Sequence, residues 1–232
     1  MIKLALVGRE YNDTIINCSG FIKGETNNID TMIKKGGGVF NIPSTDGITR
    51  KYFPCGLKGA IIINDISNST RTSFTQTLRD DYEINIDKIK ECDWVHIAYV
   101  DDIPDKILEL LVDNELPNMS IDFCKIENRK KYIDIIKKSS LIFDSRERKE
   151  LWRNLTPSVP IILHDPDGCE CFYGNVTMYE ADNEKIENLQ VNGAGDIFAS
   201  YFIKTYHDHN LKTAVYNSCA MTTIKLQEMN EV

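Results

Sequence analysis

The sequence has no apolar run that approaches the roughly 20 residues needed to cross a bilayer as a helix. Its start, residues 1–8, is apolar but too short and too soon broken by Gly8 to be a secretory signal peptide. We expect this segment to be a buried first strand. These observations predict a cytoplasmic protein with no membrane partner.

The sequence also has fewer positively charged than negatively charged residues. The chain has 27 Lys and Arg residues against 35 Asp and Glu residues, which gives a net charge of −8. The longest basic run is Arg129-Lys130-Lys131, whereas a nucleic-acid binder displaces counterions with a basic surface. The composition therefore argues against a nucleic-acid partner. It leaves ATP binding open, because backbone amides and magnesium supply local positive charge.

The cysteines show neither the pairing nor the spacing of a disulfide framework. They number seven, an odd count, and are irregularly spaced: Cys18, Cys55, Cys92, Cys124, Cys169, Cys171 and Cys219. Cys169 and Cys171 form a C-x-C pair, but no second pair or nearby histidine completes a tetrahedral metal site. We expect reduced thiols, with this pair as small buried residues of a strand.

The composition is that of a globular protein, with 42% hydrophobic and 27% charged residues in a chain of 232. From residue 93 onward, segments of strand and helix character alternate. Strands are expected over 93–99, 119–123, 141–143 and 159–163, and helices from Pro104, over 128–138 and over 145–155. This alternation predicts one α/β domain over residues 1–232, with a mostly parallel central sheet and helices on both faces. Ligands of such sheets bind at the carboxyl ends of the strands.

The first third of the chain reads as strands without long helices between them. Residues 14–21, 60–66 and 71–76 have strand character. We expect a small β lid from roughly residues 12–24 and 58–78. An exposed edge built from Ile15, Ile16 and residues 61–63 also predicts a homodimer formed through the lid strands.

The most specific motif lies at residues 192–196, Asn192-Gly193-Ala194-Gly195-Asp196. Apolar residues recur after Asp196 at helical spacing, so the glycine-rich turn begins a helix whose free amides can bind an anion. Asp196 could accept a proton from a substrate hydroxyl there. The alternative is that Asp196 only caps the helix.

A second glycine-rich segment, Gly36-Gly37-Gly38, follows an early strand that carries Asp13. Glycines let a ligand approach the backbone. The side chains of Asp13 and Asn41 can hydrogen-bond hydroxyl groups. A flexible turn at the glycines and a local turn at Asp13 are the alternatives.

Taken in this order, the segments resemble the ribokinase (PfkB) family of carbohydrate kinases. That family has an early substrate-binding Asp, a Gly-Gly-x-x-x-Asn segment and a late Gly-Ala-Gly-Asp turn. The resemblance implies a ribokinase-like fold and transfer of the ATP γ-phosphoryl group to a hydroxyl of a sugar-like molecule. Asp196 would be the catalytic base, aided by the amides of Gly193, Ala194 and Gly195. The residues that would hold the acceptor are Asp13, Gly36, Gly37, Asn41 and, on a lid strand, Arg71.

The resemblance also implies a site for ATP and Mg²⁺. Asp144-Ser145-Arg146-Glu147 occupies the place of the family's Asn-x-x-Glu segment. Asp144 and Glu147 would order magnesium-bound water, with Asn192 also on the nucleotide side and no direct protein ligand to the metal. A capping arrangement of Asp144 and Glu147 is the alternative.

The chain departs from the family pattern in places. Gln190, Val191 and Asn192 replace the usual Asp-Thr pair, and His164-Asp165 stands where a Thr-x-Gly turn is expected. An acidic residue beside nucleotide phosphates would be unfavourable. Two other functions therefore stay open: a non-catalytic sugar- or nucleotide-binding protein of the same family, and a nucleoside kinase.

Overall fold

The computed structural model describes residues 1–39, 42, 45–67, 70–125, 129–153, 155, 157–183 and 193–230. Asn41 and Asn192, two of the predicted site residues, lie outside these ranges. Arg71 is described only by its backbone.

The strands of the described chain form one sheet in the order β10-β9-β8-β7-β6-β5-β1-β3-β4, and β2 pairs with β1. Their bounds are β1 (Ile2–Cys18), β2 (Thr31–Gly38), β3 (Ile48–Asp65), β4 (Thr70–Arg79), β5 (Trp94–Ile97), β6 (Asn118–Asp122), β7 (Leu141–Ser145), β8 (Ile161–Asp165), β9 (Gly168–Tyr173) and β10 (Val176–Asp182). The run from β3 through β1, β5, β6 and β7 to β8 is parallel. The mostly parallel α/β sheet predicted from the sequence is therefore confirmed.

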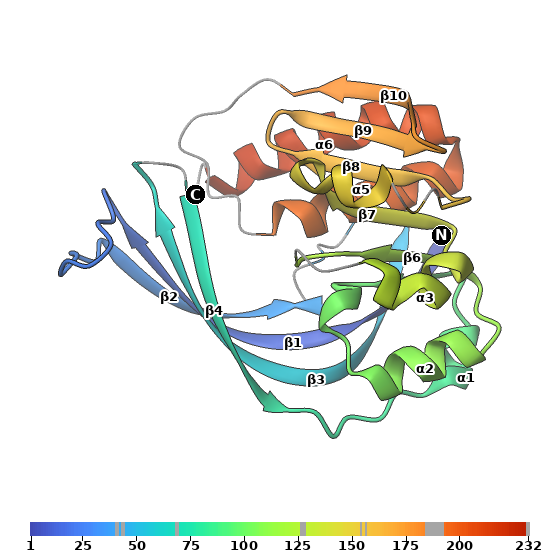
Figure 1. Ribbon diagram of the computed structural model, residues 1–232, viewed down its shortest axis with the longest axis horizontal. Helices are drawn as coiled ribbons and strands as arrows, with labels where there is room; N and C mark the ends of the chain where they lie inside the picture. Colours follow the sequence, from blue (N-terminus) through green and yellow to red (C-terminus); the bar gives the residue numbers. More distant parts are fainter. Residues whose placement is uncertain are drawn as a thin grey trace.

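Helices cover both faces of the parallel part (Figure 1). They are α1 (Ile86–Lys90), α2 (Asp105–Asp113), α3 (Ile133–Lys138), α4 (Glu150–Arg153), α5 (Ala194–Asp208) and α6 (Leu211–Asn230). Successive side chains of β1 point to opposite faces, as in any strand. Ala5 and Val7 pack in the core under α1 to α4, whereas Leu4 and Leu6 pack in the core under α5 and α6. The strong apolar character of β1 follows from this two-sided burial.

Two predicted helices are shorter than expected. In the described parts of residues 128–138 and 145–155, each predicted helix is a 3₁₀ turn followed by a short helix: η3 (Arg129–Tyr132) before α3, and η4 (Arg146–Arg148) before α4. Each turn carries an arginine that binds the buried Asp144, Arg129 from η3 and Arg148 from η4. The periodicity located both elements but not these tight first turns.

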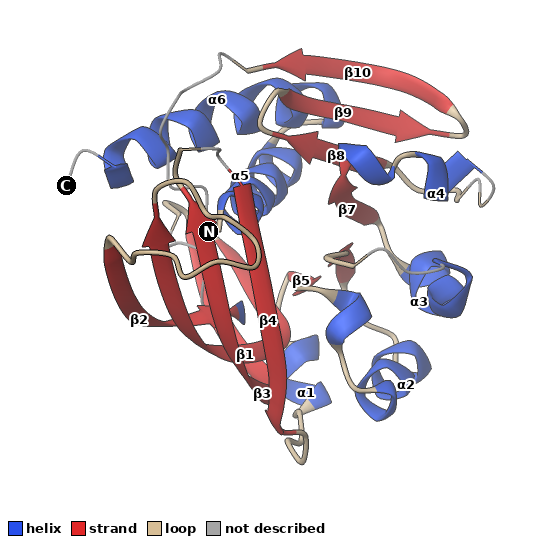
Figure 2. Ribbon diagram, turned by 60° about the vertical axis from the view of Figure 1, so that its left-hand side comes forward, coloured by secondary structure: helices blue, strands red, loops and turns tan. Residues whose placement is uncertain are grey.

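The lid is built from the outer halves of β1 and β3, which begin in the core, together with β2 and β4 (Figure 2). β1 and β3 pair in parallel along almost their whole length, from Ile2 to Cys18 on β1. β2 and β4 add antiparallel partners to their outer halves. β1 and β3 are therefore central in the lid, and the edge predicted from Ile15, Ile16 and residues 61–63 is not an edge. β2 was not predicted from the sequence, because its triple glycine has a low strand propensity.

The C-x-C pair lies in β9 with both side chains buried, as expected for core residues. All seven thiols are free, and the Sγ of Cys219 on α6 donates to the Sγ of Cys169 at 2.9 Å. Within the described residues, no group of His, Cys, Asp and Glu side chains could hold a metal ion. The helices in that part of the chain include none long and apolar enough to span a membrane.

Candidate functional site

A cleft of about 620 Å³ lies between the inner face of the lid and the carboxyl ends of the parallel strands. Residues of all four lid strands line it: Tyr11, Asp13, Gly38, Ala60, Ile62, Ser73 and Thr75. The opposite wall includes Tyr99, Asp102, Asp122, Cys124, Lys125, Glu147, Arg148, His164 and residues 193–196. This is where the general rule for parallel sheets places a ligand.

The glycine-rich turn forms the first turn of α5 at one side of the cleft. Gly193 is the N-cap residue with a φ of 83°, a left-handed conformation that favours glycine, and it makes no side-chain capping bond. Asp196 lies within the first turn rather than at the cap, so the simple capping alternative does not hold. The first backbone amides of a helix have no partner inside the helix. The amides of Gly193, Ala194 and Gly195 are therefore placed where an anion could bind, beside the carboxylate of Asp196.

Tyr99 fixes the carboxylate of Asp196. Its hydroxyl donates to both carboxylate oxygens, each at 3.0 Å. Tyr99 follows β5 and has a φ of 60°, which is uncommon for a residue other than glycine. Burial and the neighbouring Asp196 raise the pKa of Tyr99 well above its usual value, so it remains a hydrogen-bond donor. Tyr99 thus holds the proposed base in one orientation.

Asp13 and Gly37 contact each other across the pair β1 and β2. A Cβ atom added to Gly37 would overlap the carboxylate of Asp13, whereas one added to Gly36 would meet nothing within 4 Å. The carboxylate of Asp13 therefore lies directly over the Cα of Gly37. Asp13 is buried and lines the cleft. The glycine segment thus makes room for the acidic side chain rather than forming a loose turn.

Asp144 lies behind the wall of the cleft instead of on it. Its carboxylate accepts hydrogen bonds from Arg129 Nη2, Trp152 Nε1 and the backbone amide of Ser145, each at 2.8 Å, and from the Nε of Arg148. Arg148 lines the cleft and also donates to the carbonyl of Phe123 at 3.0 Å. Asp144 therefore orients a cation of the cleft wall.

Arg129 is the cation of a buried ion-pair network with Asp101 and Asp144, and its replacement should destabilise the fold. It pairs with Asp144 at 2.8 Å and Asp101 at 3.4 Å, and its guanidinium lies 4.0 Å from the ring centroid of Phe123. We expect Arg129→Met to lower the free energy of unfolding by about 3–5 kcal/mol, because it leaves buried carboxylates without this partner. Urea unfolding would measure the loss. Lys131→Met, which removes an exposed partner of Asp105, is the control and should cost less than about 1 kcal/mol. Equal losses would contradict the structural role of Arg129.

Asp102 anchors a second network at the lid end of the cleft. It binds Lys58, Tyr11 and Lys125, the last at 2.8 Å between Nζ and Oδ1. Burial opposes ionisation, but the hydrogen bonds from Lys125 and Lys58 hold the pKa of Asp102 below its usual value. The cations around Asp102 are thus already engaged with a protein carboxylate.

Asp165, which departs from the family pattern, lies at the turn between β8 and β9. Asp165 accepts hydrogen bonds from the amides of Asp167 and Gly168 at 2.9 and 3.0 Å, so it caps this turn. The described lining of the cleft includes His164 but not Asp165. Burial lowers the pKa of His164 to about 4, so it is neutral at pH 7. The acidic residue is therefore no obstacle to a phosphate in the cleft.

Of the residues predicted from sequence, one cleft brings together Asp13, Glu147, Gly193, Ala194, Gly195 and Asp196. Gly36 and Gly37 lie in β2 behind Asp13, and Arg71 lies toward the far end of the lid, paired with Asn64. Tyr99 and Asp122 were not predicted as site residues, and His164 was noted only as a departure from the family pattern. All three lie at or just beyond the carboxyl ends of β5, β6 and β8, a position that could have marked them.

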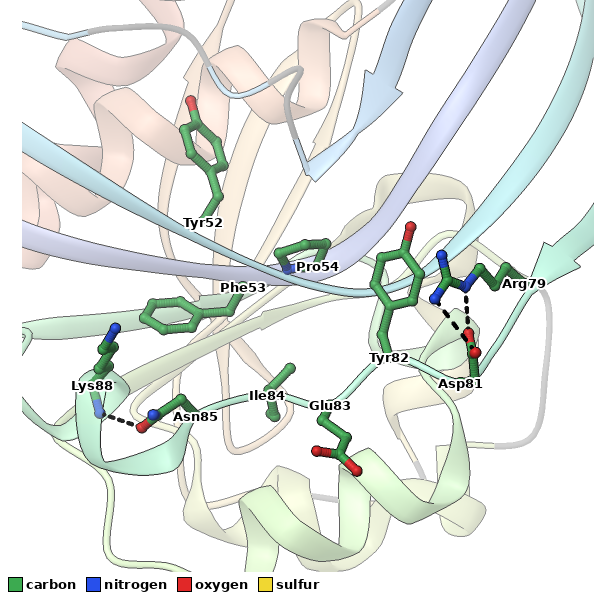
Figure 3. Close-up of a pocket in the computed structure, with 10 residues that line it drawn as sticks. All are labelled: Tyr52, Phe53, Pro54, Arg79, Asp81, Tyr82, Glu83, Ile84, Asn85 and Lys88. Atoms are coloured by element: carbon green, nitrogen blue, oxygen red, sulfur yellow. Dashed lines mark hydrogen bonds and ion pairs between the residues drawn. The ribbon is translucent and has the colours of Figure 1, made fainter.

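A second hollow of about 620 Å³ lies between β3 and the segment leading to α1 (Figure 3). There Arg79 pairs with Asp81 and lies over the ring of Tyr82. None of the residues predicted from sequence lines it. The cleft beneath the lid is therefore the candidate active site.

No protein-family model and no curated protein matches the chain. Solved structures do. Ribokinase from Thermotoga maritima has a TM-score of 0.69 at 16% identity, with 97% of this chain and 93% of that chain covered. A nucleoside kinase of the ribokinase family from Methanocaldococcus jannaschii has a TM-score of 0.72 at 16% identity, covering 98% and 92%. The nucleoside kinase from Burkholderia thailandensis, solved with inosine, has a TM-score of 0.71 at 14% identity, covering 97% and 90%.

These likenesses extend over nearly the whole of each chain. The fold is therefore ribokinase-like, as the sequence motifs implied, and the structures it resembles are those of ribokinase-family sugar and nucleoside kinases.

Proposed function

We propose that this protein transfers the γ-phosphoryl group of ATP to a hydroxyl of a sugar or sugar-like molecule. The observation that carries the proposal is the meeting of Asp196, the anion-binding turn of α5 and Asp13 in one cleft. A base, an anion site and a hydroxyl-binding carboxylate are the parts that such a transfer needs.

In this mechanism Asp13 binds the acceptor on the lid side. Asp196, held by Tyr99, accepts the proton of the attacking hydroxyl as the oxygen–phosphorus bond forms. The amides of Gly193, Ala194 and Gly195 bind the charge that develops on the transferring group. The proton ends on Asp196, and the electrons of the broken bond remain on ADP.

Magnesium, when bound with the nucleotide, offsets the negative charge of its phosphates. Glu147 fits the role of ordering magnesium-bound water, because its side chain is 71% exposed and lines the cleft. Asp144 does not fit that role, because arginine, tryptophan and amide donors already bind its carboxylate. We assign Asp144 to holding Arg148 in the cleft wall.

The apolar part of the lid favours a second candidate acceptor. Ile15, Ala60 and Ile62 form a small cluster with Tyr11, and Ala60 and Ile62 line the cleft. A sugar without an attached base has little apolar surface to pack against this inner face of the lid. The base of a nucleoside has a flat apolar face that can pack there. A nucleoside kinase is therefore the second candidate.

The proposal is tested by measuring ATP consumption and thermal stability across sugars, sugar phosphates and nucleosides. A true acceptor should raise the melting temperature by mass action and accelerate ATP consumption. Stabilisation by an acceptor without any ATP consumption would instead assign the chain to non-catalytic ligand binding.

We also propose that two copies associate through the outer face of the lid. Met32, Ile61 and Phe74 point away from the cleft and are 59%, 49% and 60% exposed. Ile61 and Phe74 lie directly opposite each other on β3 and β4. An apolar face of this kind is unusual on a monomer. Light scattering should show a dimer for the native chain and a monomer for Phe74→Lys, whereas a native monomer at all concentrations would remove the dimer.

A further inference from the structure

Asp122 is a buried carboxyl group that the proposed mechanism does not use. It is the last residue of β6, is 5% exposed, and lines the cleft. Within the described chain, no hydrogen bond or ion pair engages its side chain, in contrast to Asp102 and Asp144. A buried carboxyl without a partner is costly to stability. Such a group indicates a partner that arrives with a ligand.

The charged residues that line the cleft restrict which ligand group could bind Asp122. Five carboxyl groups line it in the described chain: Asp13, Asp102, Asp122, Glu147 and Asp196. The cations of the same lining are Lys125 and Arg148, and each is bonded to a protein carboxylate, Asp102 at 2.8 Å and Asp144 at 2.5 Å. A phosphate on the acceptor would meet carboxylates and find no free cation among these groups. A hydroxyl or ammonium group would instead donate to Asp122.

We infer that Asp122 is a second acceptor-binding carboxyl group, and that the acceptor presents a hydroxyl or an ammonium group to it and carries no phosphate. This rests on the proposed kinase function and names the chemical class of its acceptor. Asp13 and Asp122 bind the acceptor from the lid and from the sheet, and Asp196 lies beside Asp122.

The first test needs no ligand. Burial and repulsion by Asp196, Asp144 and Asp101 raise the pKa of Asp122 well above its usual value, and Arg148 offsets this in part. Tyr99 and Cys124 also face it. Because the pKa is higher in the folded state than in the unfolded one, stability falls as the pH rises from about 4 through the folded pKa. Asp122→Asn removes this penalty.

We therefore expect Asp122→Asn to melt about 2–6 °C above the native protein at pH 8, with a smaller difference at pH 4. Asp113→Asn removes an exposed carboxylate of α2 and should change the melting temperature by about 1 °C or less at either pH. A lower melting temperature for Asp122→Asn at pH 8 would mean that the carboxylate stabilises the fold, and would overturn the inference.

The second test uses matched probes: ribose and ribose 5-phosphate; glucose, glucosamine and glucose 6-phosphate; inosine and inosine 5′-monophosphate. Binding is followed by thermal shift and calorimetry. We expect an uncharged or amino member to bind, its phosphate counterpart not to bind, and Asp122→Asn to weaken binding by about 10- to 100-fold. Glucose and glucosamine distinguish the hydroxyl from the ammonium group.

Tighter binding of a phosphate member, or equal binding by the Asn variant, would overturn the inference. So would a failure of every uncharged and amino member to bind. Magnesium chloride alone could also stabilise the native protein. If Asp122→Asn abolished that stabilisation, the carboxyl group would be assigned to a metal and the inference would be overturned. ATP consumption distinguishes the two proposals: binding of an uncharged acceptor without turnover removes only the kinase function, and turnover of a sugar phosphate removes only the inference.

Discussion

Asp196→Asn should reduce turnover by about 10²- to 10⁴-fold while leaving nucleotide affinity and melting temperature nearly unchanged. The substitution keeps the size of the side chain and leaves the amides of the α5 turn in place. Asparagine can still bond to the hydroxyl of Tyr99, which contacts both oxygens at 3.0 Å in the native protein. It cannot accept the proton of the attacking hydroxyl. Steady-state kinetics with an acceptor from the screen would measure the loss.

The matched control is Asp208→Asn. Asp208 is the last residue of the same helix, and its carboxylate pairs with Lys204 far from the cleft lining. We expect native turnover from this variant. Nucleotide binding by Asp196→Asn should be equal to or slightly tighter than native binding, because a negative charge beside the phosphates is gone. Full activity of Asp196→Asn would exclude Asp196 as the base.

The second large effect should come from a single methyl group on the lid. Gly37→Ala places a Cβ atom where the carboxylate of Asp13 now lies, so this side chain must move away. Loss of a hydrogen bond to a charged group weakens binding by about 10- to 100-fold, and we expect the KM for the acceptor to rise by that factor. The KM for ATP should stay close to its native value, because the shift is confined to the lid.

Gly36→Ala is the control for this experiment. The two glycines are neighbours in β2, and a Cβ at Gly36 would meet nothing within 4 Å. Both variants change the backbone propensity of the strand in the same way, so a difference between them isolates the contact with Asp13. An unchanged acceptor KM in Gly37→Ala would remove Asp13 from the acceptor site.

The parts of the site that could be predicted from sequence are those whose residues lie within short contiguous motifs. The turn at residues 193–196 was recognisable because glycines and an Asp precede a helix-periodic run. The family resemblance placed Asp13 and the glycine segment at the same acceptor site. The structure gives a physical reason for the glycine at position 37, because the carboxylate of Asp13 occupies the space that a side chain there would fill.

The rest depends on contacts between residues far apart in the chain. Nothing local to Tyr99 shows that its hydroxyl reaches Asp196, which is 97 positions away. The same holds for Asp144. Its place after a strand suggested a nucleotide site, but arginines from two separate turns bind it from both sides. Tertiary pairing of this kind determined which carboxyl groups line the cleft and which lie behind it.

The continuity of β1 and β3 has a mechanical consequence. Residues 4–7 of β1 hydrogen-bond to β5 in the middle of the sheet, and the same strand reaches Cys18 at the far end of the lid. No flexible linker separates the two regions, so the lid cannot swing as an independent body. It can only flex, most readily where the pairing of β1 and β3 shifts register between Gly8 and Glu10. A lid of this construction should melt together with the core in one cooperative transition, and could not be excised without removing the middle of the sheet.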